Sequence, residues 1–412
     1  MTHERIEVVV VGAGQAGLAV SHELKEAGVE HVVLERSRIG ETWRGRWDSF
    51  CLVTPNWSVL LPGGAYAGDD PDGYMHRDEV VAHLERYADG FGAPVRLGVE
   101  VTAIDALPEG GFRLSASTGE IAASSVVLCT GAYQRPHRPA AAAALPAGLP
   151  AIDAEGYSNP AGLPPGPVLI VGSGQTGCQL AEELQEAGRV VFLACGRAPW
   201  LPRLIGGRDV VAWMVEIGFF ENTPAVLPTP QARLVANVQA SGHGGGRDLH
   251  YRTLAAMGVN LLGRLSAIED GTARFAPDLA DSVAFGDARY RDLRAQIQKS
   301  CAERGLPAPE MPDPASFSYE PRDSLSLRDL GTVIFTSGFR PDYQRWVRFP
   351  DAFDPLGFPI HEDCASSVVP GLYFAGVHFL RKRKSSLLLG VGEDAALIAR
   401  RIADPLHREV PA

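Results

Sequence analysis

The hydrophobic positions of this chain form short, continuous apolar runs, each followed by glycine and then by a helix-like segment. Residues 7–11 are a glutamate and four valines, and residues 167–171 form a second run of the same kind. A run of this length, bounded by turn residues, is typical of a strand that is buried on both faces of a parallel sheet. Further runs end in small residues and glycine at 126–131 and 333–338. This alternation predicts an α/β fold.

The strongest signal is an internal repeat, in which the pattern beginning at Gly12 returns at Gly172. Residues 12–17 and 172–177 both read GxGxxG, and positions 12–35 and 172–195 share nine identical residues without gaps. In such a strand–turn–helix unit the glycines allow a tight turn, close approach of the backbone to a pyrophosphate, and close helix–strand packing. The N-terminus of the helix favours the negative charge of the pyrophosphate. We therefore predict two Rossmann-like dinucleotide-binding domains.

The two copies differ at the positions that distinguish one dinucleotide from another. Glu35 ends the second strand of the first copy, where a carboxylate accepts hydrogen bonds from ribose hydroxyls. The second copy has Ala194 and Cys195 there, and Arg197 follows. A missing carboxylate and a nearby arginine favour a ribose 2′-phosphate. The interpretation is FAD at the first copy and NADPH at the second, and the alternative for Arg197 is an ordinary surface arginine.

The resemblance of this chain to a known family implies that the second domain is inserted in the first, in a three-layer arrangement. We expect an FAD-binding domain over residues 1–150 and 325–412 and an NADPH-binding domain over residues 151–324. An insertion at about 206–245 contains apolar, helix-like segments, and it either covers the active site or is only structural.

Two segments of that insertion, 210–215 and 232–238, have the apolar content of helices. Residues 278–305 predict one or two more helices, and residues 306–321 predict a proline-rich loop. These segments define the helical part of the predicted second domain.

Composition and charge narrow the function classes. The chain has 412 residues, and its 38 Lys and Arg against 49 Asp and Glu give a net charge of −11, which disfavours binding to nucleic acid or to anionic lipid. No apolar run is long enough to span a membrane, and residues 1–7 lack a basic and apolar leader, so we expect a cytoplasmic protein without a membrane partner. The six cysteines lie far apart and form no CxxC pair, which disfavours a zinc site, a disulfide framework and a disulfide reductase.

Taken together, these motifs resemble the flavin-containing monooxygenase superfamily, and in particular a short bacterial branch of flavoproteins without an assigned role. The resemblance is carried by the two glycine patterns, by Glu35 with residues 40–44, and by residues 336–339 and 371–376. It implies that the first unit binds FAD, that the second binds NADPH, and that the C-terminal segment completes the FAD domain. It also implies that reduced flavin and O₂ form a C4a-hydroperoxyflavin, which passes one oxygen atom to a small N-, S- or carbonyl-bearing substrate.

The resemblance and the motifs together select candidate site residues. Asn56 is the candidate counterpart of the asparagine that steadies the flavin hydroperoxide, and His378 is the best placed histidine because it follows Gly376 closely. Residues 381–384 are four consecutive basic residues, which either form a solvated surface run or bind the NADPH phosphate or an acidic substrate. The candidate cofactor-binding residues are Gly12, Gly14, Gln15, Gly17, Glu35, Arg36, Thr42, Trp43, Arg44, Trp47, Gly131, Gly172, Gly174, Gln175, Thr176, Gly177, Arg197, Gly338, Gly376, Lys384 and Ser385.

Among these candidates, the resemblance places Trp43, Arg44 and Trp47 near the isoalloxazine ring. The alternative is that the two tryptophans are packing residues. The family's fingerprint before the second glycine pattern contains a histidine, whereas this chain has Asp153 there, with Tyr157 four residues on.

The leading hypothesis is an NADPH-dependent, FAD-containing monooxygenase that uses O₂ and a small-molecule substrate. The alternatives are a flavoprotein reductase or oxidase without oxygen insertion, and a non-catalytic nucleotide sensor. The substrate, the choice among N-oxygenation, S-oxygenation and Baeyer–Villiger chemistry, and the effect of Asp153 stay open. So does the oligomeric state, for which a homodimer is one option.

Overall fold

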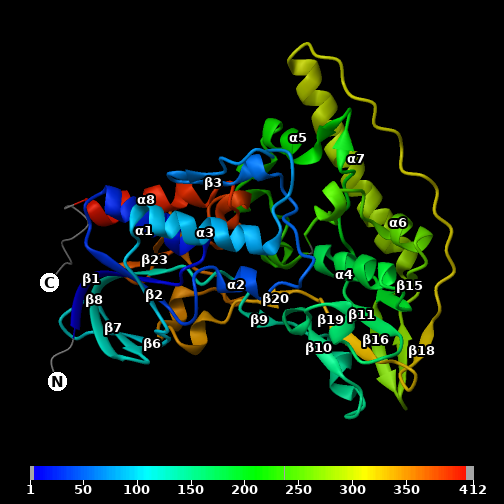
Figure 1. The fold of residues 1–412 in the computed structure, drawn as a ribbon, viewed down its shortest axis with the longest axis horizontal. Helices are drawn as coiled ribbons and strands as arrows, with labels where there is room; N and C mark the ends of the chain where they lie inside the picture. The colour runs from blue at the N-terminus through cyan, green and yellow to red at the C-terminus, as the bar shows by residue number, and fades with distance from the viewer. Residues whose placement is uncertain (1–3, 236, 405–412) are drawn as a thin grey trace.

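Two α/β units lie side by side in the computed structural model of this chain, which describes residues 4–235 and 237–404 (Figure 1). The chain crosses between the units twice, and the two crossings pair with each other. Strand β9 (Arg135–Pro136) on the way out is antiparallel to β20 (Phe339–Arg340) on the way back. The second unit is therefore an insertion in the first, as predicted.

The first unit is built on a nine-stranded sheet whose centre is parallel. Its main path runs β21-β22-β23-β8-β1-β2-β5, and β6 and β7 extend from β8. Val10 of β1 lies opposite Val33 of β2 and Val127 of β8, and all three are fully buried. The strands are β1 (Glu4–Val11), β2 (His31–Glu35), β5 (Val95–Leu97), β6 (Val101–Ala106), β7 (Phe112–Ala116), β8 (Gly119–Leu128), β21 (His361–Glu362), β22 (Ala365–Ser366) and β23 (Leu372–Phe374).

Three helices pack together beside this sheet. Helix α1 (Gln15–Glu26) contacts both α3 (Arg77–Phe91) and α8 (Val391–Ala403), the last helix of the described chain (Figure 1). The C-terminal segment thus returns to the first unit and completes its core. A short helix α2 (Glu41–Arg44) and the hairpin β3 (Leu60–Leu61) and β4 (Gly64–Ala65) complete this unit.

The second unit has three layers. Its central sheet is parallel, with the order β10-β19-β11-β12-β15. Residues of this sheet alternate between two cores: Ile170 and Leu193 face the helices, whereas Leu169 and Phe192 face a small antiparallel sheet. The elements are β10 (Ala151–Asp153), β11 (Val168–Val171), β12 (Val191–Ala194), β15 (Asn260–Leu262), β16 (Leu265–Glu269), β17 (Thr272–Phe275), β18 (Ser324–Ser326), β19 (Thr332–Phe335), α4 (Gln175–Glu186), α6 (Tyr251–Ala256) and α7 (Leu279–Glu303).

The domain boundary predicted at residues 324 and 325 needs correction. β18 and β19 belong to the second unit, because β19 lies between β10 and β11 in the parallel sheet. All four residues of β19 are buried, as expected for a strand in the middle of the parallel sheet of the second unit. The first unit resumes only near β20. The predicted outer ends, residues 1–3 and 405–412, lie outside the described residues.

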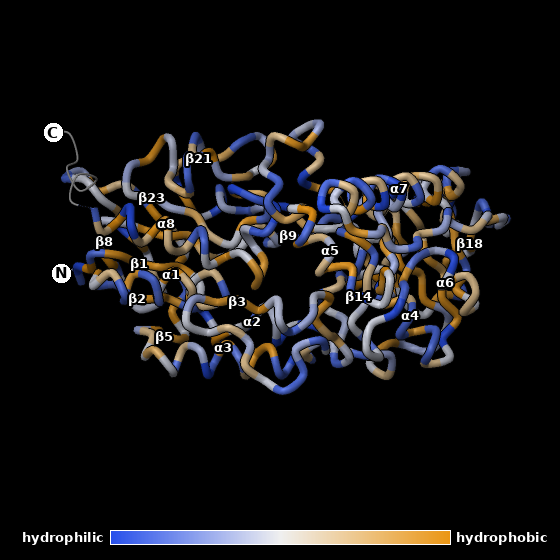
Figure 2. Tube along the Cα trace, turned by 90° about the horizontal axis from the view of Figure 1, so that it is seen from above, coloured by the Kyte–Doolittle hydropathy of each residue, from blue (hydrophilic) through white to orange (hydrophobic). Residues whose placement is uncertain are grey.

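The predicted insertion at 206–245 is less helical than its sequence suggests. The first helix-like segment forms α5 (Val210–Glu216), after the hairpin β13 (Leu204–Ile205) and β14 (Arg208–Asp209). The second, 232–238, forms no α-helix in its described part; it overlaps a 3₁₀ turn over Pro230–Leu234, and Ala236 lies outside the described residues. The insertion packs on the long helix α7, which is one helix and not two. Figure 2 shows hydrophobic residues gathered inside each of the two units.

Candidate functional site

The first glycine loop connects β1 to α1 and leaves open space at the start of that helix. A Cβ at Gly17 would lie 1.8 Å from the carbonyl oxygen of Gly12, so only glycine fits there. A Cβ at Gly14, by contrast, would meet nothing within 4 Å. The loop is therefore closely packed on its inner side and open on the side where the first N–H groups of α1 lack helical partners. This geometry suits a pyrophosphate.

Glu35 closes the far side of this loop from the end of β2. One carboxylate oxygen accepts the backbone N–H of Ala13 at 2.9 Å, and the other accepts the backbone N–H of Ser37, also at 2.9 Å. The side chain is buried. Each oxygen keeps a further lone pair, so the carboxylate can still accept a hydrogen bond from a ribose hydroxyl.

Gln15 ties three segments together at the first turn of α1. Its side-chain oxygen accepts the indole N–H of Trp43 at 3.0 Å, and its side-chain nitrogen donates to the carbonyl oxygen of Ser386 at 3.2 Å. Gly376 lies on the same side, since a Cβ there would be 2.6 Å from Cβ of Ala16. The structure therefore brings the N-terminal glycine loop, α2 and the C-terminal segment to one place.

The other predicted residues of the first site differ in their distance from the place where the glycine loop, α2 and the C-terminal segment meet. Gly131, at the end of β8, faces the carbonyl oxygen of Gly376. Arg44 pairs with Glu85, and both Arg36 and Thr42 are exposed. Gly338 follows β19, and its carbonyl oxygen accepts the backbone N–H of His137 at the crossing between the units.

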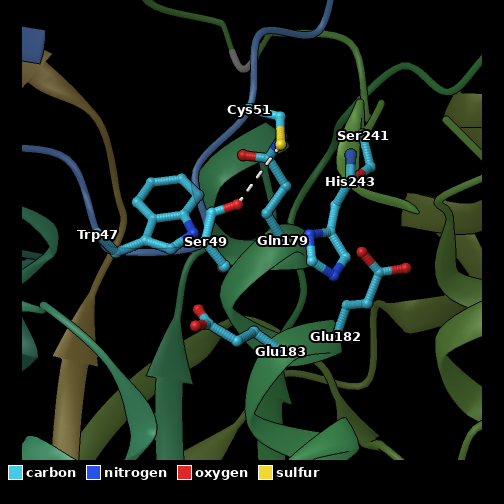
Figure 3. A pocket seen from close by; sticks show the side chains of 8 residues that line it. All are labelled: Trp47, Ser49, Cys51, Gln179, Glu182, Glu183, Ser241 and His243. Atoms are coloured by element: carbon cyan, nitrogen blue, oxygen red, sulfur yellow. Dashed lines mark hydrogen bonds between the residues drawn. The ribbon is translucent and has the colours of Figure 1, made fainter. Parts of the chain in front are cut away.

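Trp47 is a packing residue of the second unit's core, which is the alternative that its sequence left open. It is 4% exposed and lies in the cluster that contains residues of α4 and β12. It also lines a cavity of about 20 Å³ between the first unit and α4 (Figure 3), which is enough for one water molecule. The other lining residues are Ser49, Cys51, Gln179, Glu182, Glu183, Ser241 and His243. This cavity is too small for a flavin ring or a substrate.

The second glycine loop repeats the geometry of the first. A Cβ at Gly177 would lie 2.0 Å from the carbonyl oxygen of Gly172, and a Cβ at Gly172 would lie 2.7 Å from backbone atoms of Thr336. Gly174 precedes the first turn of α4. Thr176 lies in that turn with Gln175, whose side chain donates to the carbonyl oxygen of Val238 at 3.3 Å. The loop is thus anchored to β19 on one side and to the insertion on the other.

A hydroxyl network takes the place of the missing carboxylate in this second copy. The Ser173 hydroxyl oxygen accepts the backbone N–H of Gly196 at 2.8 Å and lies 2.6 Å from the hydroxyl of Tyr251. Tyr251 in turn donates to the carbonyl oxygen of Gly196 at 2.5 Å. Cys195 is fully buried, whereas Arg197 is exposed and has no ion-pair partner among the described residues. No sequence pattern pointed to Tyr251, which lies 78 residues from Ser173.

The two catalytic candidates are held by backbone partners. Asn56 is 4% exposed; its side chain donates to the carbonyl oxygen of Asp70 at 2.9 Å and accepts the backbone N–H of Met75 at 2.7 Å. Nε2 of His378 lies 3.0 Å from the carbonyl oxygen of Arg233, and the ring stacks on Tyr133. Burial lowers the pKa of His378 to about 4, so the imidazole is neutral near pH 7.

The residues of the basic run also have protein partners. Lys384 contacts Glu221 and Glu393. The Ser385 hydroxyl accepts the backbone N–H groups of Arg381 and Lys382 at 3.2 and 3.0 Å. Lys384 and Ser385 therefore shape the turn before α8. Asp153, at the fingerprint position, pairs with Arg138 at 2.8 Å.

Comparison with known proteins places this geometry in a family. A family profile described as pyridine nucleotide-disulphide oxidoreductase matches residues 9–204. An uncharacterized CzcO-like oxidoreductase of Geobacillus kaustophilus is 31% identical over 396 residues, which cover 95% of this chain and 96% of that protein. The chain belongs to the CzcO-like oxidoreductases. The CzcO oxidoreductase of Bacillus subtilis is 27% identical and covers 96% of this chain and 99% of its own length.

Solved structures of flavin monooxygenases have the same fold as this CzcO-like oxidoreductase. A flavin-containing monooxygenase from Stenotrophomonas maltophilia superimposes with a TM-score of 0.67 at 19% identity, over 97% of this chain and 98% of that one. A closed cyclohexanone monooxygenase gives 0.53 at 16% identity, over 98% of this chain and 85% of that one. The predicted resemblance to the flavin-containing monooxygenases and the two-Rossmann α/β fold are confirmed. The chain is thus an oxidoreductase of this family with the fold of flavin-containing monooxygenases. No helix of the described chain is long and apolar enough to cross a membrane.

Proposed function

We propose that this CzcO-like oxidoreductase is an NADPH-dependent, FAD-containing monooxygenase that inserts one oxygen atom from O₂ into a small N-, S- or carbonyl-bearing substrate. The observation that carries the proposal is the difference between two otherwise equivalent glycine loops. Glu35 closes the first loop with a carboxylate, and Ser173 closes the second with a hydroxyl. The first is suited to the free ribose of FAD, and the second, with Arg197 beside it, to a 2′-phosphate.

The residues of the first unit fit a flavin dinucleotide by their shape. The open space at Gly14 faces the start of α1, where N–H groups are available to the pyrophosphate. Trp43, Gln15 and the carbonyl of Ser386 form a connected polar edge at the same end of the unit. When bound, the flavin supplies electron transfer from NADPH and the activation of O₂.

The protein's own contribution is to bind, to orient and to exclude water. Leu387 and Leu389 of the C-terminal segment and Phe219 and Trp213 of the insertion pack against the same buried apolar cluster, which limits access of water from that side. The ring of His378 is held by a hydrogen bond to the carbonyl oxygen of Arg233 and by stacking on the ring of Tyr133. It therefore acts as a positioning residue in this proposal, because its neutral ring already has a backbone partner.

The alternative is a flavoprotein reductase or oxidase that passes electrons from NADPH without inserting oxygen. The six buried, unpaired cysteines offer no redox-active pair for disulfide reduction. The fold is nevertheless shared with a bacillithiol disulfide reductase of Staphylococcus aureus, at a TM-score of 0.61 and 13% identity, so an experiment must separate the two functions.

The test begins with the purified protein, which should release FAD and not FMN on denaturation. Anaerobic NADPH should bleach the flavin faster than NADH does. With methyl p-tolyl sulfide and ¹⁸O₂, mass spectrometry should find the label in the sulfoxide. Label-free or absent products across sulfides, amines and ketones, with peroxide released in proportion to the NADPH oxidised, would support the alternative.

A further inference from the structure

The basic run of residues 381–384 contains one cation that differs from its neighbours. Arg381 pairs with Asp363 at 3.3 Å and with Asp394 at 3.0 Å. Lys382 and Lys384 each contact the same two carboxylates, at 2.5 to 2.8 Å; these are Glu221 and Glu393. Three of the four cations therefore already have carboxylate partners.

Arg383 has no such partner in the part of the chain that the structure describes. Its guanidinium carbon lies 4.1 Å from the ring centroid of Phe219 and 4.6 Å from that of Phe379. Nε is buried without a hydrogen-bond acceptor, and no carboxylate of the described residues lies within 4.0 Å of the guanidinium. Burial lowers the pKa of Arg383 to about 10. A cation held in this way lacks a counter-ion, and a bound anion would supply one.

The position of Arg383 connects it with the proposed flavin site. Phe219 comes from the insertion of the second unit, and Phe379 comes from the C-terminal segment of the first. The backbone N–H of Arg383 also donates to the carbonyl oxygen of Asn222 at 2.8 Å. Three residues further along, the carbonyl of Ser386 accepts the Gln15 side chain at the first glycine loop. Arg383 thus lies where the two units meet, one short turn from that loop.

The backbone conformation of Phe379 is a further sign of a binding site near Arg383. Its φ is +53°, in the left-handed region that side chains other than glycine, asparagine and aspartate rarely adopt. Residues held in such conformations cluster at binding and active sites. Here the strained backbone places the second aromatic ring against the guanidinium.

We propose that Arg383 binds the carboxylate of a small organic acid and that this acid is the molecule which the enzyme oxygenates. The rings of Phe219 and Phe379 fix the guanidinium plane, and its planar fork of N–H groups matches a carboxylate with two parallel hydrogen bonds. In the proposed function the phosphates of the dinucleotides bind at the two glycine loops and at Arg197, so they do not require this cation. The identification of the acid as the oxygenated molecule rests on the proposed function, whereas the anion site itself does not.

The experiment is isothermal titration calorimetry on the full-length, FAD-loaded protein. The probes are 3-(methylthio)propanoate and phenylacetate, each compared with its neutral amide. In the wild type, at least one acid should bind roughly tenfold or more tightly than its amide, as expected for charge-assisted hydrogen bonds. This preference should disappear in Arg383→Met.

Two further variants make the result specific. Lys382→Met removes the same charge one residue away, where the cation already has two carboxylate partners, and it should retain the preference for the acid. Arg383→Gln removes the charge but keeps a planar, polar head group, and it replaces Arg383→Met as the decisive variant if the latter does not fold. Flavin content and the rate of anaerobic reduction by NADPH are measured for each variant.

The outcomes separate this proposal from the proposed function. Lost preference for the acid with unchanged flavin content and reduction rate supports the site. Equal preference in the wild type and the Arg383 variants, or no preference for either acid in the wild type, overturns it. Reduced affinity for NADP⁺ in the Arg383 variants, without acid binding by the wild type, would also overturn it and assign Arg383 to a nucleotide phosphate. Failure of NADPH reduction in the wild type concerns only the proposed function, because calorimetry still reports the anion site.

Discussion

At the scale of single residues, the two glycine loops differ in the side chain that closes them, a carboxylate in the first and a hydroxyl in the second. Glu35 bridges the backbone of its loop with a carboxylate, while Ser173 bridges the equivalent gap with a hydroxyl that Tyr251 supports. Because the second loop has a hydroxyl in place of a carboxylate, it lacks the negative charge that would repel a phosphate there. Arg197 follows immediately after Gly196 and has no carboxylate partner among the described residues, so its charge is available there.

This arrangement makes a direct prediction for Arg197→Ala. The KM for NADPH should rise roughly tenfold or more, since a hydrogen bond to a charged group contributes about 1.5–3 kcal/mol. The KM for NADH, which lacks the 2′-phosphate, should stay the same. The matched control is Arg274→Ala, on an exposed position of β17. Steady-state kinetics with both nucleotides measure the effect, and an unchanged NADPH-to-NADH ratio would return Arg197 to the role of a surface residue.

The buried side chain of His378 should make the stability of the protein depend on pH. Its pKa falls from 6.5 to about 4 on folding, because burial disfavours the charged ring. Between these two values the unfolded chain binds more protons than the folded protein, so stability should decrease as the pH is lowered from about 6.5 towards 4. His378→Gln should make the melting temperature less dependent on pH in this window. An equally steep profile for the variant would mean that His378 titrates normally in the folded state.

At the scale of elements, the sequence predicted the parts that local pattern determines. The valine run of β1 and the run of β11 are strands because nearly every residue in them is buried, and the glycines after them are fixed by contacts within a few residues. The glycine loops, Glu35 and the helices α1 and α4 therefore lie where they were predicted.

The remaining elements depend on partners far along the chain. β19 has an apolar run that either sheet could accept, and only its pairing with β10 and β11 decides between them. Segment 232–238 has the composition of a helix, yet only its first residues overlap a 3₁₀ turn, Pro230–Leu234, and Leu234 packs against the core of the first unit. Nothing in the sequence singled out Tyr251, and the basic run of residues 381–384 did not separate Arg383 from its neighbours, because the surroundings of both residues come from segments that are distant in sequence.

The network around the second loop predicts the effect of Tyr251→Phe. This variant removes a buried hydroxyl that contacts Ser173 and Gly196, so the free energy of unfolding should decrease by about 1–2 kcal/mol. The KM for NADPH should rise while the FAD content stays unchanged, because only the second loop loses its support. Tyr290→Phe is the control, since its hydroxyl binds the carbonyl of Pro312 in the same unit, away from the loop. A KM that rises equally in both variants would indicate general destabilisation.

At the scale of the whole molecule, polar contacts hold the two units together beside the crossing strands. Tyr74 of the first unit donates to the Asp209 carboxylate of the second at 2.5 Å, and Arg203 pairs with Asp209 while donating to the carbonyl of Val53 at 2.8 Å. Arg203 is 4% exposed. This buried link and the β9–β20 pair fix the two units, and with them the two glycine loops, relative to each other.

A rapid-mixing experiment without substrate separates a monooxygenase from an oxidase or reductase. The FAD-loaded protein is reduced anaerobically with NADPH and mixed with oxygenated buffer, while the flavin spectrum and released peroxide are recorded. A monooxygenase predicts a spectrum distinct from both oxidised and reduced flavin that persists with NADP⁺ present, and slow release of peroxide. Immediate return of the oxidised spectrum with one peroxide per flavin would contradict the proposed monooxygenase activity and identify an oxidase or reductase.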